Sequence, residues 1–256
     1  MGTMLHLSFS YLRYYKKQTA ALLAAILLSA ALLSGLGGLF ESGRLATLER
    51  ARTEYGDWHC SLRADAPWFQ EFDKDAAADG YHIRQAGLEI VRKAIEEPFS
   101  MQLVYADAAY LELTGRKVLK GMYPQKEREI AIDRQPLRNL GVSEELGTQV
   151  VLDGEAFTLC GIMGEMPSKL ADRLGDFRQV FVSRTLDYGT NGSFLYLKFE
   201  ESQEVYPQIR AFAQRFGLTG EEISTNRGIS RYVGGDAPLE VWEILKTGFT
   251  QKGAGL

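Results

Sequence analysis

The chain has 256 residues, of which 45% are hydrophobic and 24% are charged, so it can bury a sizeable core and does not have the composition of a disordered protein. Its 33 acidic and 29 basic residues give a net charge of −4, and it has no basic stripe with interleaved aromatic residues, which argues against nucleic-acid binding. The apolar residues are concentrated in one block near the N-terminus.

That block, residues 18–40, contains no charged residue and is rich in Ala and Leu, which predicts a transmembrane helix. At 1.5 Å per residue it gives roughly 34 Å of helix, enough for a hydrocarbon layer of about 30 Å. A cleaved secretory signal is the alternative, because a basic region precedes the run. The apolar stretch is longer than a usual signal core and no A-x-A site follows it, so we favour the span.

The flanking charges predict the orientation of this helix. Residues 1–17 form a predicted amphipathic lead that carries Arg13, Lys16 and Lys17 and no acidic residue, so this lead should be cytoplasmic and the chain from Glu41 onward should lie outside. Residues 41–56 continue the helical pattern and predict a stalk that stops at Gly56. A separate short helix joined at Gly43 is the alternative.

Residues 57–235 predict a mixed α/β extracytoplasmic domain of the α+β class, because short β-like runs alternate with a few amphipathic helices rather than with regular βαβ units. The first half should contain a strand in WHCSLR and a helix that Asp65 caps and that ends near Asp79. Candidate strands follow in YHIRQAG, LEIVRKA and SMQLVYAD, separated by Gly87 and Pro98. AYLEL and KVLKG then lead to a turn at Gly121.

In the second half EIAID predicts a strand, and RQPLRNLG predicts a short helix that ends at Gly141. The dipeptide Asp153-Gly154, between TQVVL and EAFTLCGIM, predicts a hairpin with a type I′ turn. QVFVSRTL and SFLYLKFE are further strands. The apolar stripe of VYPQIRAFAQRFG predicts an amphipathic helix.

Four stretches in this half resemble a known family in their order and spacing. They are Gly121-Met122-Tyr123-Pro124, Glu129-Ile130-Ala131-Ile132, Leu146-Gly147-Thr148 and Phe157-Thr158-Leu159-Cys160-Gly161-Ile162. Together they resemble the extracytoplasmic core domain of FtsX-like and MacB-type ABC-transporter permeases, over roughly residues 5–242. The resemblance implies that residues 236–256 lead to a second transmembrane helix, which this sequence lacks. We therefore expect either a truncated chain or a naturally short relative.

By this resemblance the chain is the N-terminal part of a permease subunit involved in ATP-driven export or release of a peptide, lipid or lipoprotein substrate. The implied partners are an ABC-type ATPase subunit, a second permease copy and membrane lipid. The sequence has no G-x-x-x-x-G-K-[ST] loop, so ATP would be used by the partner and the chain itself would not be an enzyme. The alternative is a membrane-anchored extracytoplasmic binding or sensor module without transport activity.

Residues with catalytic or metal-binding chemistry are few. His59 and His82 have no acid or cysteine at metal-ligand spacing, and no nucleophile signature occurs, so we predict no catalytic, cofactor or metal site and assign no substrate-binding residue. Cys60 and Cys160 would both lie outside the cytoplasm and could form a disulfide. Two buried free thiols are the other interpretation, which the apolar alternation around both residues slightly favours.

Overall fold

In this computed structural model the described residues are 14–64, 80–174, 178–201, 204–220, 222–230 and 232–233. The chain forms two compact units, residues 1–49 and 50–256, and each is described by itself. Most of the predicted N-terminal lead, the helix predicted after Asp65 and the C-terminal segment 236–256 lie outside the described residues.

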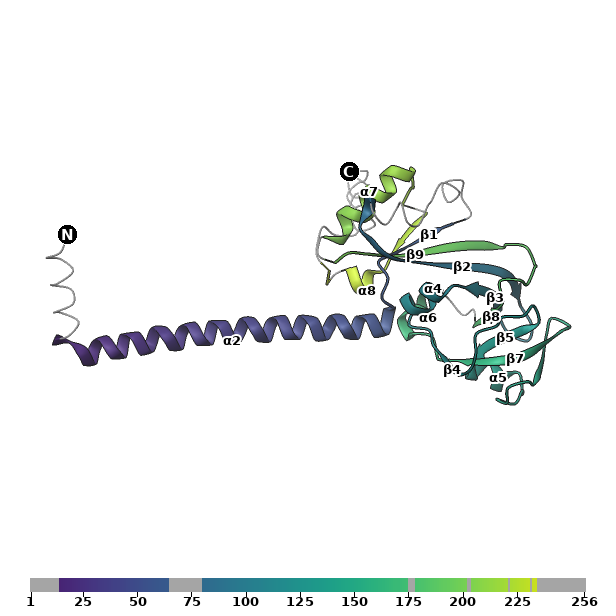
Figure 1. Ribbon diagram of the computed structural model, residues 1–256, viewed down its shortest axis with the longest axis horizontal. Helices are drawn as coiled ribbons and strands as arrows, with labels where there is room; N and C mark the ends of the chain where they lie inside the picture. Colours follow the sequence, from purple (N-terminus) through teal and green to yellow (C-terminus); the bar gives the residue numbers. More distant parts are fainter. Residues whose placement is uncertain are drawn as a thin grey trace, which may run out of the picture. The chain divides into compact units, whose positions relative to one another are not determined.

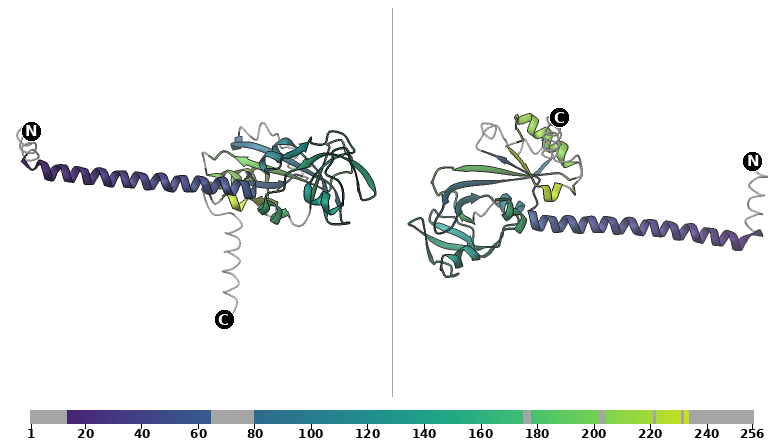
Figure 2. Two further views of the ribbon diagram at one scale, coloured as in Figure 1. Left: turned by 90° about the horizontal axis from the view of Figure 1, so that it is seen from below. Right: turned by 180° about the vertical axis from the view of Figure 1, so that it is seen from behind.

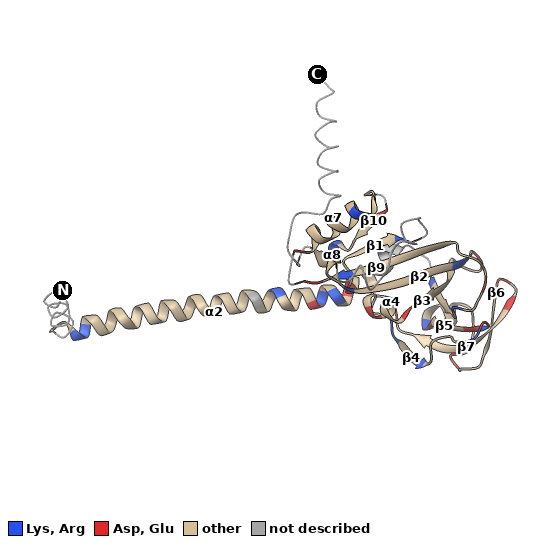
Figure 3. Cartoon of the chain, turned by 45° about the horizontal axis from the view of Figure 1, so that its top comes forward, with Lys and Arg blue, Asp and Glu red and all other residues tan. Residues whose placement is uncertain are grey.

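One long helix, α2 (Lys16–Tyr55), contains both the predicted span and most of the predicted stalk, without a break at Gly43. Among the described residues it is the one helix long and apolar enough to cross a membrane, and none of its apolar window is buried within the protein. Figure 3 shows that its central part carries no Lys, Arg, Asp or Glu, whereas charged residues gather near both ends. The helix ends at Tyr55, as the sequence predicts.

The folded domain is built on one mixed sheet with the strand order β10-β1-β9-β2-β3-β8-β5-β7-β4, and β6 also pairs with β7. Most neighbours are antiparallel; the pairs β3·β8 and β5·β7 are parallel. Figure 1 and Figure 2 show the long strands β2 and β9 side by side. The strands are β1 (Cys60–Arg63), β2 (Ile83–Ile95), β3 (Met101–Ala106), β4 (Val118–Gly121), β5 (Glu129–Asp133), β6 (Gln149–Leu152), β7 (Glu155–Met163), β8 (Arg178–Val182), β9 (Gly192–Phe199) and β10 (Ile223–Thr225).

In the described part of the domain five short helices accompany the sheet, and three apolar clusters make up the core. One cluster packs the apolar stripe of α7 against β1 and β9, a second joins β3, β5, β6, β7 and β8, and a third joins α4 and α6 to the middle of the sheet. The helices are α4 (Ala108–Leu113), α5 (Arg134–Asn139), α6 (Ser168–Leu174), α7 (Val205–Phe216) and α8 (Arg227–Ser230). The architecture is α+β with one long N-terminal apolar helix, as predicted.

One glycine-based prediction is confirmed and another is wrong. Asp153 and Gly154 both have positive φ, 49° and 78°, between β6 and β7, as a type I′ turn requires. The prediction that Gly87 separates two strands is wrong, because β2 runs through it. A Cβ at Gly87 would lie 2.4 Å from the backbone nitrogen of Tyr110, so this glycine lets α4 approach the strand instead of making a turn.

Candidate functional site at the end of helix α2

The C-terminal end of α2 meets the folded domain through residues of the same compact unit. Gly56 follows the last helical residue with φ of 80°, and its N–H donates to the Arg52 carbonyl at 2.9 Å. A Cβ there would lie 2.9 Å from the Leu113 carbonyl oxygen. The next residue, Asp57, donates its own N–H to that same oxygen at 2.6 Å. Glycine therefore ends the helix and brings the chain against α4.

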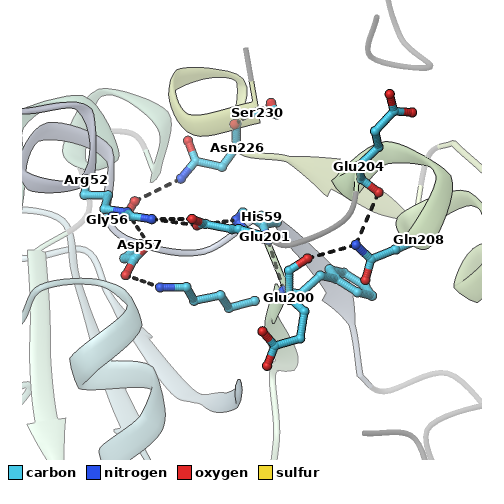
Figure 4. Close-up of polar contacts among 12 residues, drawn as sticks. Arg52, Gly56, Asp57, His59, Glu200, Glu201, Glu204, Gln208, Asn226 and Ser230 are labelled. Carbon is cyan, nitrogen blue, oxygen red and sulfur yellow. Dashed lines mark hydrogen bonds and ion pairs between the residues drawn. The ribbon is translucent and has the colours of Figure 1, made fainter. Parts of the chain in front are cut away.

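Four charged side chains form a network at this point (Figure 4). The Nη2 atom of Arg52 lies 2.7 Å and 2.6 Å from the two carboxylate oxygens of Glu201, and its Nε lies 3.0 Å from Oδ1 of Asp57. Lys198, on β9, pairs with the other oxygen of Asp57. The side chains of Arg52 and Glu201 are 21% and 23% exposed, so solvent weakens their attraction much less than at a free surface. The network ties the last turn of α2 to β9 and the segment after it.

A buried histidine extends the network into the sheet. The imidazole of His59 has no exposed surface; its Nδ1 accepts the Phe199 N–H at 3.0 Å, and its Nε2 lies 3.3 Å from Oε1 of Glu201. Because Nδ1 is an acceptor, the neutral ring carries its proton on Nε2, facing Glu201. The adjacent His59 imidazole, together with Arg52, lowers the pKa of Glu201 to about 2. Glu201 is therefore a carboxylate at neutral pH.

Uncharged groups secure the last carbonyls of α2. The amide nitrogen of Asn226 donates to the carbonyls of Tyr55 and Gly56 at 3.3 Å and 3.2 Å, and the indole N–H of Trp58 donates to the Tyr55 carbonyl at 3.0 Å. These bonds satisfy acceptors that a helix end otherwise leaves without partners. Gly228 packs so closely that a Cβ there would lie 2.2 Å from the Tyr55 ring. The junction is thus fixed by hydrogen bonds and packing as well as by charge.

The charged groups of this arrangement are paired with one another. Arg52, Asp57, Lys198 and Glu201 neutralise each other, and His59 is fully buried. Within the described ranges no group of three or more His, Cys, Asp or Glu side chains could hold a metal ion. What the geometry provides is an attachment of the last turn of α2, which belongs to the folded unit, to β9 and the segment after it.

The two cysteines lie far apart in the sheet order and do not form a disulfide. Cys60 is on β1 and fully buried, whereas Cys160 is on β7 and partly exposed. The strands β9, β2, β3, β8 and β5 lie between β1 and β7. A disulfide needs Cα atoms within about 7 Å, a separation that only neighbouring strands provide. The structure supports two unbridged thiols, but the expectation that both are buried is wrong for Cys160, which is partly exposed.

Nothing in the sequence indicates a partner for Arg52, and His59 was set aside for lack of a nearby acid. The acid is present: Glu201 is in contact with both residues although it lies 149 positions from Arg52. A single sequence carries no signal that pairs residues so far apart. The one local indication of a role for Arg52 is its place in the last turn of α2, where a basic residue interacts favourably with the helix dipole.

No protein-family model matches the chain, and no curated protein matches it. Among solved structures it is similar to the extracellular domain of the noncanonic ABC-type transporter YknZ from Gram-positive bacteria, with 14% identity, 65% of this chain and 98% of that chain covered, and a TM-score of 0.44. It is also similar to the periplasmic region of MacB from Actinobacillus actinomycetemcomitans, with 10% identity, coverage of 75% and 100%, and a TM-score of 0.45.

A third similar structure is a domain of a protein described as a permease from Porphyromonas gingivalis, with 12% identity, coverage of 75% and 97%, and a TM-score of 0.40. The first is described as an extracellular domain and the second as a periplasmic region. With TM-scores below 0.5 these similarities do not assign the chain to a family. Any function proposed for the chain therefore has to rest on its own residues.

Proposed function

We propose that the chain is the membrane anchor and extracytoplasmic domain of an ABC-transporter permease that takes part in ATP-driven export or release of a peptide, lipid or lipoprotein. The observation that carries this proposal is α2, a single helix of 40 residues with an exposed apolar stretch and a last turn held in the folded domain by ion pairs. In this role the chain does no chemistry itself, and a partner ATPase hydrolyses ATP.

The anchoring step rests on exposed apolar surface. Leucines along residues 18–40 are mostly more than half exposed, for example Leu33 at 71% and Leu39 at 71%. A helix with apolar side chains on all sides is stable in the hydrocarbon core of a bilayer, where each Leu near the centre favours insertion by about 0.5 kcal/mol. The orientation rests on charge: Arg13, Lys16 and Lys17 precede the apolar stretch and favour a cytoplasmic N-terminus, with the folded domain outside.

The coupling step rests on the junction. A displacement of a membrane helix reaches an outer domain only if the connection is stiffer than the solvent-exposed chain around it. Arg52 and Asp57 hold the helix end through ion pairs. Their partners are Glu201, which follows β9, and Lys198, which lies on β9. In a dimer with a second permease copy, ATP-driven movement of the membrane helices would then rearrange the outer domains and move substrate.

Purification of the full-length gene product from native membranes, followed by mass spectrometry, tests this proposal. We expect an ATP-binding-cassette subunit in near-equal amount with the permease chain. Recovery without such an ATPase, or with a kinase or hydrolase instead, would contradict transport and favour a membrane-anchored binding or sensor module. Quantitation against an unrelated single-span membrane protein, purified in parallel, controls for carry-over of abundant transporters.

A further inference from the structure

A second feature of the domain, apart from the α2 network, is a cavity of about 300 Å³ over the middle of the sheet. Trp58 and Leu170 of α6 line it together with side chains from six strands. Its volume suits a small organic molecule rather than a few waters. The remaining lining residues are Ser61, Glu89, Val91, Gln102, Gln179, Phe194, Tyr196 and Ser224.

The strand register puts these side chains on one face of the sheet. Ser61 lies opposite both Ser224 and Tyr196, Glu89 lies opposite Phe194, and Gln102 lies opposite Gln179. Residues directly opposite on neighbouring strands point to the same side. The cavity wall is therefore a continuous surface that crosses β10, β1, β9, β2, β3 and β8.

This face carries polar residues at buried positions where close packing alone would select apolar ones. The other face of the same strands carries Leu62, Leu195 and Leu197, which are 1% exposed or less and pack beneath α7. On the cavity side Glu89 is 3% exposed and Gln179 is 4% exposed. Burial of a carboxyl group and an amide is unfavourable unless a partner compensates for it, so their place on this wall calls for an explanation.

Glu89 is held by neutral groups only. Its Oε1 accepts hydrogen bonds from the Tyr110 hydroxyl at 3.1 Å and from Nε2 of Gln179 at 2.5 Å, and the Tyr196 hydroxyl also bonds to the carboxyl. The nearby cation, Arg116, is paired with Asp133, with Nη2 and Oδ1 2.5 Å apart. Among the described residues Glu89 therefore has no ion-pair partner.

Two buried groups on the cavity wall, Glu89 and Gln179, lack a compensating charge or hydrogen-bond donor among the described residues. Burial raises the pKa of Glu89 to about 7, against the opposing effect of its hydrogen bonds and of Arg116, so the group can gain or lose a proton near neutrality. The Oε1 atom of Gln179 is buried and has no hydrogen-bond partner in the described part of the chain. Both groups would be satisfied by a ligand that brings a positive charge and N–H donors.

We propose that this cavity binds a small molecule with an aromatic or aliphatic body and a protonated amine. The ammonium group pairs with the Glu89 carboxylate and donates to Oε1 of Gln179. The rings of Trp58, Phe194 and Tyr196 contact the apolar body and favour a cation near their faces. The proposal stands on the cavity alone and does not depend on a role in transport.

Calorimetric titration of the full chain in lipid nanodiscs tests this with two matched probes, phenethylamine and 2-phenylethanol. They have the same shape, but only the first is charged. We expect saturable binding of the amine, at least about tenfold tighter than that of the alcohol, since hydrogen bonds to charged groups contribute about 1.5–3 kcal/mol. Amine binding should also tighten about tenfold from pH 6 to pH 8, as Glu89 loses its proton. Empty nanodiscs give the background.

The variant Glu89→Gln should remove the preference for the amine and leave alcohol binding unchanged. Glu145→Gln is the matched control, because that carboxyl is exposed and does not line the cavity. No saturable amine binding to the wild-type chain, or equal affinity for both probes, would overturn the proposal. The wild-type comparison decides even if Glu89→Gln fails to fold. Loss of amine binding in Glu145→Gln would equally contradict a specific site.

Discussion

Replacement of Arg52 by Ala should destabilise the folded domain by about 2 kcal/mol, because the change removes the centre of the junction network. Exposed ion pairs contribute roughly 0.2–1 kcal/mol, whereas breaking a fully buried pair costs about 3–5 kcal/mol. Arg52 lies between these limits: its side chain is 21% exposed, it contacts both oxygens of Glu201 at 2.7 Å and 2.6 Å, and it also pairs with Asp57. Its loss leaves two carboxylates without their shared cation.

Urea unfolding of the full chain in nanodiscs, followed by tryptophan fluorescence, measures this effect. The indole N–H of Trp58 donates a hydrogen bond to the Tyr55 carbonyl, so the fluorescence of this residue reports on the junction itself. With a slope of about 2 kcal/mol per molar urea, the expected loss lowers the midpoint by about 1 M. Arg52→Lys should fall between wild type and Arg52→Ala, because an ammonium group keeps the charge but not the planar contact with Glu201.

Arg50 provides a matched control on the same helix. Its side chain is 80% exposed and, among the described residues, pairs with Glu54 one turn away, so Arg50→Ala should leave the midpoint close to that of the wild type. Equal midpoints for Arg50→Ala and Arg52→Ala would refute the conclusion that the network holds the helix end to the domain.

Three further predictions concern single groups. Wild type should have a larger free energy of unfolding than Glu201→Gln at any pH above 4.5, the usual pKa of a Glu carboxyl. This difference should disappear as the pH falls toward about 2, because folding lowers the pKa of Glu201 to that value. Gly228→Ala should cost about 1–3 kcal/mol, since the added methyl group meets the Tyr55 ring at 2.2 Å. Thiol titration should find two free thiols in denaturant, with Cys160 reacting slowly in the folded protein, because burial raises its pKa to about 11, and Cys60 not reacting at all.

Each of these three predictions has a control or an outcome that would contradict it. Urea midpoints at pH 3 and pH 7 test Glu201, and a constant difference between the two proteins would contradict its lowered pKa. Gly192→Ala adds a methyl group at an ordinary 3.6 Å from Phe194, so a loss equal to that of Gly228→Ala would show that close packing is not the cause. Fewer than two thiols in denaturant would bring back the disulfide interpretation.

The elements that the sequence predicts well are those with local causes. The hairpin at Asp153-Gly154 follows from backbone conformations that few dipeptides adopt, and α7 follows from its apolar stripe and from Gly217, which has φ of 64° at its end. The span in α2 follows from composition alone. In these cases the residues that determine the structure are neighbours in the chain.

The features that sequence reasoning missed depend on residues distant in the chain. Gly87 has the pattern of a strand break, but its role is to admit the backbone of Tyr110 from α4. Glu89 is a charged residue in a candidate strand and nothing local marks it as buried, but α4 and α6 cover its face of the sheet. The contact of Arg52 and His59 with Glu201 forms only when the sheet is complete. Alternation along one strand cannot show which face another element will cover.

The most direct test of the central claim, that α2 crosses a membrane and holds the folded domain outside, is thiol labelling of intact cells with a membrane-impermeant maleimide. In a Cys160→Ala background, Ser143→Cys places an exposed thiol on the domain, and Ser8→Cys places one in the predicted cytoplasmic lead. We predict that Ser143→Cys is labelled in intact cells and that Ser8→Cys is labelled only after lysis. The reverse pattern, or protection of both positions until lysis, would contradict the account.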